Sequence, residues 1–158
     1  RQVYTTTSTT NLAWVKALGA DRVIDYKTED YMSIAKDVDI VLDTLGQNYS
    51  LESFEVVKQG GIVISVVGPL DEVSAKMLGM SDYKLPEALA KASRDRKADY
   101  KFILMHPNGA HLNEIKSLIE DEKIKPIIDR VYPFSESIEA FTHLATGRAK
   151  GKIVVKVS

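Results

Sequence analysis

Strand-like and helix-like segments alternate along nearly the whole chain, and this alternation restricts the fold more than any other feature. Runs rich in β-branched and other apolar residues, typical of strands, occupy residues 3–7, 23–24, 38–42, 62–67, 100–105, 127–128 and 153–157. Between them, apolar residues recur at helical spacing, as in Leu12, Val15 and Leu18. This pattern predicts an α/β fold, a doubly wound parallel sheet with helices on both faces.

The stretch from about residue 69 to residue 99 departs from this rhythm. It is helical by composition, and its apolar residues include Met77, Leu78, Leu85 and Leu89. We predict a helical insertion here. Its basic residues Arg94, Arg96 and Lys97 are compensated in sequence by Asp95 and Asp99, which favours a solvated helix face over a nucleic-acid patch.

Charge and hydropathy exclude two classes of partner. The chain has 158 residues, a length that predicts one domain. Its formal net charge is -1, whereas binding of nucleic-acid phosphates needs uncompensated Lys and Arg. The longest apolar runs are far shorter than the roughly 20 residues of a membrane helix. We therefore expect a cytoplasmic protein with neither a nucleic-acid partner nor a membrane segment.

Metal and hydrolytic chemistry also lack their usual residues. The chain contains no cysteine, so it offers no thiolate ligand, thiol nucleophile or disulfide. Its histidines, His106, His111 and His143, lack the spacing of metal ligands, and we expect them to be surface or capping residues. No G-x-S-x-G turn is present. The sequence predicts no metal site and assigns no catalytic residue.

Four ordered blocks carry a resemblance to a known family. They are residues 18–26 (LGADRVIDY), residues 39–46 (DIVLDTLG), Gly60-Gly61 leading to Val66-Val67-Gly68, and residues 147–155 (GRAKGKIVV). Together they resemble the medium-chain dehydrogenase/reductase superfamily, which includes the zinc-type alcohol dehydrogenases, in its quinone oxidoreductase-like branch. The resemblance implies a Rossmann-like fold, NADP(H) as cofactor, and hydride transfer to a small-molecule substrate, a quinone or an α,β-unsaturated carbonyl.

The chain departs from that family in its first part. It has no G-x-G-x-x-G cluster, and its blocks align from the second Rossmann strand onward. We therefore expect residues 1–158 to form a partial dinucleotide-binding domain without the first strand and glycine-rich turn, and without the N-terminal GroES-like catalytic domain. On its own such a chain is expected to be inactive. The alternative is a truncated, non-catalytic nucleotide-binding or assembly module.

One candidate cofactor contact follows the first strand. An NAD site places a carboxylate there for the ribose 2'-hydroxyl, whereas an NADP site supplies donors to a 2'-phosphate. Here Thr7 and Ser8 offer hydroxyls, and no acid precedes Asp21. The resemblance adds the phenol of Tyr26, although many NADP-binding relatives have a lysine where Asn11 stands. The alternative is that Thr7 and Ser8 cap the following helix, and one cluster can serve both roles.

Further candidates follow later strands. In a doubly wound sheet the ligand lies outside the carboxyl ends of the strands, where a glycine lets the backbone pass close to it. The resemblance assigns cofactor contact there to Thr44, Gly46, Val67 and Gly68, and places Leu104 and Met105 beside the nicotinamide. The alternatives are ordinary turn glycines and, for Leu104 and Met105, buried core.

Lys152 and the sheet edges complete these expectations. Lys152 precedes the last strand, where the resemblance places a basic residue near the cofactor pyrophosphate; a lysine there is otherwise simply solvated.

In the Rossmann order the absent first strand would lie between the strand near Val3 and the one at residues 63–67. Exposed edges recruit strands, so we expect pairing with a second copy or with a missing segment.

Overall fold

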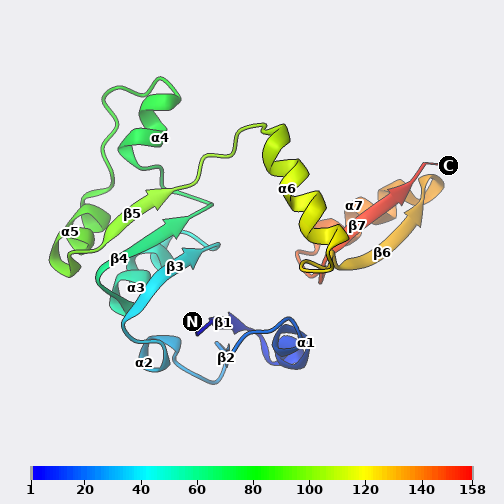
Figure 1. Ribbon diagram of the computed structural model, residues 1–158, viewed down its shortest axis with the longest axis horizontal. Helices are drawn as coiled ribbons and strands as arrows, with labels where there is room; N and C mark the ends of the chain where they lie inside the picture. The colour runs from blue at the N-terminus through cyan, green and yellow to red at the C-terminus, as the bar shows by residue number, and fades with distance from the viewer. Residues whose placement is uncertain (1, 158) are drawn as a thin grey trace. The chain divides into compact units, whose positions relative to one another are not determined.

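The computed structural model describes residues 2–157, which form two compact units (Figure 1). The first unit ends at Met105 and the second begins at His106. None of the helices in the described residues is long and apolar enough to cross a membrane.

The first unit alternates strands and helices, which confirms the α/β fold predicted from the sequence. Its elements are β1 (Tyr4–Thr7), η1 (Thr9–Asn11), α1 (Leu12–Ala17), β2 (Arg22–Asp25), α2 (Tyr31–Ile34), β3 (Val38–Asp43), α3 (Asn48–Val56), β4 (Val57–Ser65), α4 (Glu72–Met77), α5 (Glu87–Arg96) and β5 (Asp99–Phe102). Helices α4 and α5 lie within the stretch expected to be a helical insertion.

All strand pairs in this unit are parallel, and they form two separate sheets. Strand β1 pairs with β2, and the second sheet has the order β3-β4-β5. This order corrects the prediction that residues 63–67 lie beside the absent first strand and so form an open edge. Strand β4 is hydrogen-bonded to a neighbour on each side. The open edge belongs to β3, where Ile40 and Leu42 are 62% and 61% exposed. Residues 62–65 of this apolar run therefore belong to a central strand that is paired on both sides, whereas Val66 and Val67 lie beyond its end and are exposed.

Strand β4 begins earlier than its sequence suggests. Helix α3 ends at Val56, so Gly60 and Gly61 do not terminate it but lie inside the following strand. A Cβ at Gly61 would come within 2.8 Å of the carbonyl oxygen of Asp39 in β3. The glycine thus permits close approach of the two backbones, at the point where the β3–β4 register shifts.

Two apolar clusters hold the first unit together. Phe54, Val57 and Val63 form one cluster with Leu89 and Ala98, which joins α3 and α5 to the β3–β5 sheet. The other cluster is built on Ile24, Ala35 and Val56 and includes the half-buried residues Tyr4, Tyr31 and Val38. It packs the β1–β2 sheet and α2 against α3 and the start of β3, so both sheets belong to one unit.

The second unit repeats the parallel arrangement on a smaller scale. It contains α6 (Gly109–Glu120), β6 (Ile128–Pro133), η2 (Phe134–Glu136), α7 (Ser137–Ala145) and β7 (Lys152–Lys156). Strands β6 and β7 pair in parallel, and α7 packs on both. Its buried residues include Tyr132 and Ala140.

Candidate functional site

The carboxyl end of β3 is organised by a buried carboxylate. Asp43 is the last residue of β3 and is only 5% exposed. Its Oδ1 accepts hydrogen bonds from the backbone N–H groups of Leu45 (2.9 Å) and Gly46 (2.8 Å), and its Oδ2 accepts one from Ser50 Oγ (2.6 Å). One side chain therefore fixes the turn after β3 and ties it to the first turn of α3.

Ser65 plays the matching role at the end of β4. Its fully buried hydroxyl accepts hydrogen bonds from the N–H groups of Val67 (3.3 Å) and Gly68 (3.2 Å) and donates to the carbonyl oxygen of Gly68 (3.1 Å). The N–H of Val66 donates to the carbonyl oxygen of Asp43 (3.1 Å). These bonds join the turns after β3 and β4 into one polar network.

Four of the predicted cofactor residues are brought together on this network. Thr44 and Gly46 lie in the first turn, and Val67 and Gly68 lie in the second. A Cβ at Gly46 would stand 3.0 Å from Val67 Cγ2, and both glycines have positive φ, +71° and +102°. Val67 is 54% exposed, whereas Asp43 is buried. The two turns thus form one continuous surface at the carboxyl ends of adjacent strands.

The segment after β5 adjoins the same end of the sheet. The N–H of Ile103 donates to the carbonyl oxygen of Ser65 (2.9 Å), which places the chain beside the β4 turn. Of the two predicted residues that follow, Leu104 is half-buried and Met105 is 79% exposed. The core alternative is therefore wrong for Met105.

A second buried carboxylate supports the chain beyond Gly68. Asp71 accepts hydrogen bonds from the N–H of Ser74 (2.6 Å) and from that of Phe102 at the end of β5 (2.8 Å). The hydroxyl of Tyr100 donates to the carbonyl oxygen of Pro69 (2.7 Å). Asp43, Ser65 and Asp71 are not among the residues predicted from the sequence. For Asp43 a signal existed, since an acid that closes an apolar run and stands three residues before a glycine is suited to bind the turn amides.

Both carboxylates are held in the ionised form. Burial raises the pKa of Asp43, but the hydrogen bonds from Ser50, Gly46 and Leu45 outweigh it, so its pKa lies below the ordinary value. The pKa of Asp71 is lowered by the same balance: burial acts against ionisation, and bonds from Ser74 and Phe102 prevail. The polar network therefore contributes negative charge beneath the surface of the two turns.

Three other predicted residues meet at the carboxyl end of β1–β2. Thr7 ends β1, and its carbonyl oxygen accepts a hydrogen bond from the N–H of Tyr26 (3.1 Å), whose side chain is 58% exposed. Ser8 lies at the start of η1 but makes no side-chain capping bond; its Oγ contacts Thr10 Oγ1 (3.3 Å) and Asn11 Nδ2 (3.4 Å). The capping alternative for Ser8 is thus wrong, since its hydroxyl caps no backbone amide here.

An unforeseen acid lies at this strand end. No acid precedes Asp21 in the sequence, yet the parallel register sets Asp25 directly across from Thr7. Asp25 is 3% exposed, and its carboxylate accepts hydrogen bonds from Thr9 Oγ1 (2.6 Å) and the N–H of Lys27 (3.1 Å). The Thr9 hydroxyl makes the largest contribution to lowering the pKa of Asp25. This carboxylate ties η1 to the turn that carries Tyr26.

Lys152 and the histidines lie in the second unit. Lys152 is exposed at the start of β7, and its N–H donates to the carbonyl oxygen of Ile127 (2.8 Å).

His143 is more than a surface or capping residue: its Nδ1 is 2.9 Å from the hydroxyl of Tyr132 and its Nε2 is 3.2 Å from Asp129 Oδ2. These bonds fasten α7 to β6. In residues 2–157, no three His, Asp or Glu side chains gather to hold a metal ion.

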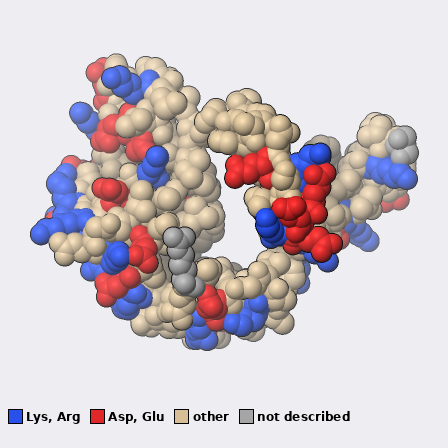
Figure 2. Space-filling model, in the orientation of Figure 1, with Lys and Arg blue, Asp and Glu red and all other residues tan. Residues whose placement is uncertain are grey.

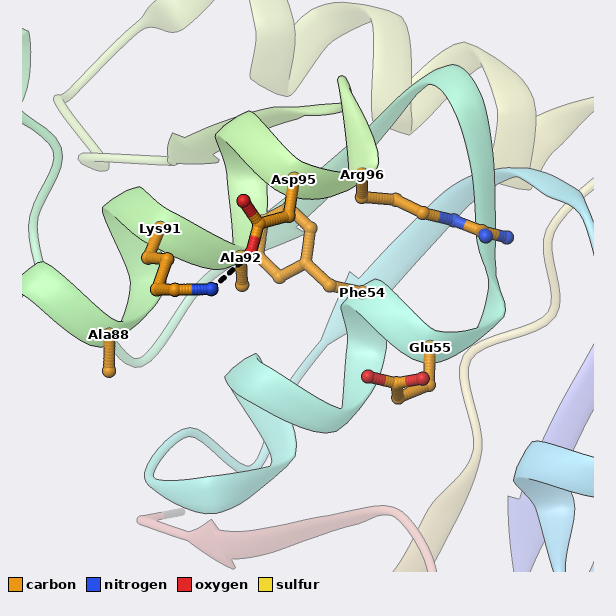
Figure 3. A pocket seen from close by; sticks show the side chains of 7 residues that line it. All are labelled: Phe54, Glu55, Ala88, Lys91, Ala92, Asp95 and Arg96. Atoms are coloured by element: carbon orange, nitrogen blue, oxygen red, sulfur yellow. Dashed lines mark hydrogen bonds and ion pairs between the residues drawn. The ribbon is translucent and has the colours of Figure 1, made fainter.

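A separate groove lies between α3 and α5 (Figure 3). Its volume is about 330 Å³, and it is lined by Phe54, Glu55, Ala88, Lys91, Ala92, Asp95 and Arg96. Lys91 and Asp95 form an ion pair at its rim, and Arg96 Nε donates to the carbonyl oxygen of Val57 (2.5 Å). Since Val57 begins β4, this end of the groove lies at the opposite end of that strand from the turns of Gly46 and Gly68.

The basic residues of α5 are paired within the same unit. Arg94 forms an ion pair with Glu87 (2.6 Å) and Arg96 with Asp37 (3.2 Å). These partners differ from Asp95 and Asp99, which the sequence predicted to compensate the basic charges. Figure 2 shows Lys and Arg side chains interspersed with Asp and Glu on the face drawn. The α5 helix thus presents a solvated face of mixed charge.

Comparisons with known proteins agree with this architecture. Residues 18–155 match the family described as zinc-binding dehydrogenase. The chain is 31% identical over 156 residues to 2-methylene-furan-3-one reductase of Solanum lycopersicum, covering 98% of this chain and 33% of that protein. It is 30% identical over 156 residues to NADPH-dependent alkenal/one oxidoreductase, chloroplastic, of Arabidopsis thaliana, again covering 98% of this chain and 33% of that protein.

A solved structure gives the same result for the fold. The quinone oxidoreductase from Coxiella burnetii superposes with a TM-score of 0.77 at 28% identity, covering 99% of this chain and 45% of that one. The chain thus spans between a third and a half of the length of these relatives. With its Rossmann-like parallel sheets and the matching residues 18–155, the chain belongs to the zinc-binding dehydrogenase family, within the medium-chain dehydrogenase/reductase superfamily.

Proposed function

We propose that this chain is the nucleotide-binding part of an NADPH-dependent oxidoreductase that transfers hydride to a quinone or an α,β-unsaturated carbonyl. The observation that carries the proposal is the buried Asp43–Ser65 network, which sets Gly46 and Gly68 side by side at the carboxyl ends of β3 and β4. This is where a doubly wound sheet binds its nucleotide. The names of the reductases similar to this chain support the class of reaction.

The residues at these turns fit a nicotinamide nucleoside. Thr44 offers a hydroxyl, and the exposed Val67 and Met105 offer apolar surface for a flat ring. The cofactor would supply the hydride, and the chain would supply binding and orientation. Leu104 is the remaining proposed contact. Because Asp43 and Ser65 hold the turn amides in place, the turns need little reordering on binding.

The β1–β2 end fits the adenosine side of the same cofactor. We assign the 2'-phosphate to the hydroxyls of Thr7 and Ser8 and the phenol of Tyr26. Ser8 supports this assignment because its hydroxyl is not engaged in capping a backbone amide. Lys152, exposed in the second unit, is our candidate for the pyrophosphate. The groups that contact the substrate would lie in a catalytic domain beyond these residues.

The proposal is tested by cofactor preference. In the active protein that contains this chain, we expect NADPH to be used at least about tenfold more efficiently than NADH, because charged hydrogen bonds to the 2'-phosphate are worth roughly 1.5–3 kcal/mol. The measurement is kcat/KM for each nucleotide with a quinone and with an enone. Equal use of the two nucleotides would contradict the assignment of Thr7, Ser8 and Tyr26.

The open edge of β3 supports the second candidate, an assembly module. Ile40 and Leu42 are exposed on a strand whose outer edge pairs with no strand in the described residues. Such an edge recruits another strand. We expect the 158-residue chain to sediment as a dimer or larger species and to be inactive alone. A monomer in sedimentation velocity experiments at about 100 μM, a high concentration for specific assembly, would contradict the assembly candidate.

A further inference from the structure

The turn after β2 contains a cation that the cofactor assignment above does not use. Lys27 follows Tyr26, and its N–H donates to Asp25 Oδ1 (3.1 Å). Its side chain is exposed and makes no ion pair with any residue in the described part of the chain, although its charge helps to lower the pKa of Asp25. A lysine with an unpaired ammonium therefore extends from the turn that also presents the phenol of Tyr26.

Asp25 holds this lysine close to the hydroxyl cluster. Its carboxylate binds the backbone of Lys27 on one side and the hydroxyl of Thr9 on the other, and it lies across from Thr7 in the β1–β2 register. Because Asp25 is buried and its oxygens are already occupied by donors, it fixes the two loops to each other. The residues that carry the hydroxyls, the phenol and the ammonium therefore come together at one strand end.

Two other basic groups in the described residues on or beside this sheet already have partners. Lys16 donates to the carbonyl oxygens of Ala20 (2.9 Å) and Asp21 (2.6 Å), ahead of β2, and Arg22 pairs with Glu29. Their positive charges are therefore partnered within the protein. Lys27, by contrast, retains its capacity to bind an external anion.

We propose that Lys27 is a specificity-determining residue that binds the 2'-phosphate of NADPH. The inference rests on the proposed function and adds the positive charge that the hydroxyls of Thr7 and Ser8 cannot provide. A phosphate monoester carries nearly two negative charges at neutral pH. A flexible ammonium provides a compact charge for such a group, and Asp25 acts as a positioning residue beneath it.

The test uses the full 158-residue chain and adenosine 2'-monophosphate, which carries the distinguishing phosphate but does not need a pyrophosphate site. We expect this nucleotide to bind more tightly than adenosine, and Lys27→Gln to weaken its binding about fivefold, as for an exposed charge pair. Adenosine binding should change by less than about twofold. Lys27→Arg should retain most of the affinity. NMR titration measures all of these affinities.

Lys36→Gln is the matched control, because Lys36 is an exposed lysine between α2 and β3, distant in sequence from the hydroxyl cluster. It should leave both affinities unchanged. If Lys27→Gln binds adenosine 2'-monophosphate as the unmodified chain does, the inference is wrong while the proposed function stands. An equal loss for both ligands would show that Lys27 supports the turn and would also overturn the inference. If the unmodified chain does not distinguish the two ligands, the proposed NADPH preference fails as well.

Discussion

Replacement of Asp43 by alanine should lower the free energy of unfolding of the first unit by about 3 kcal/mol, because three donors lose their acceptor in a buried site. The donors are the hydroxyl of Ser50 and the N–H groups of Leu45 and Gly46. The measurement is urea unfolding at pH 7 followed by fluorescence of Trp14, the single tryptophan, which lies in α1 of the same unit. The fluorescence of Trp14 therefore reports the unfolding of the unit that contains Asp43.

The pH dependence gives this prediction a second, independent measurement. The folded pKa of Asp43 is lowered, so its contribution is fully present above the unfolded pKa of about 4 and is lost as the pH falls through the folded value. The stability difference between the unmodified chain and Asp43→Ala should therefore shrink on acidification. Asp82→Ala, at an exposed aspartate, is the control and should change stability by less than about 0.5 kcal/mol. A loss no larger than that of the control would show that the turn does not depend on Asp43.

Replacement of Ser8 by aspartate should reverse the cofactor preference. A carboxylate at this position would stand beside the proposed 2'-phosphate, and juxtaposed like charges cost several kcal/mol. We expect the Kd of NADPH to rise by about tenfold to a hundredfold. The Kd of NADH should stay within about twofold, since the substitution introduces no clash with a ribose hydroxyl. Fluorescence titration with each nucleotide measures both constants.

Ser81→Asp provides the matched control for this substitution. Ser81 is exposed in the turn after α4, so the same added charge lies far along the chain from β1. It should alter neither Kd. If Ser8→Asp weakens both nucleotides equally, the loop after β1 serves the nucleotide as a whole, and its assignment to the 2'-phosphate is wrong.

Local sequence patterns were sufficient to predict the class of fold and the positions of the turns. Apolar runs such as 38–42 and 62–67 are typical of strands, and Gly46 and Gly68 follow them where a parallel sheet binds ligands. These signals are local because secondary structure and turn conformation depend on neighbouring side chains. The resemblance at residues 18–26 and 39–46 predicted the same succession of strands and turns along the chain.

Tertiary structure alone decided which polar groups meet. The sequence places Asp25 well after Thr7, but parallel pairing sets them opposite each other and brings Thr9 and Lys27 to the same carboxylate. Likewise, Asp43 and Ser65 join their two turns only because β3 and β4 are neighbours, and the open edge belongs to β3 only because β4 is central. Strand order and register follow from the packing of distant apolar faces, as in the cluster of Phe54, Val57 and Val63, and no local pattern encodes that packing.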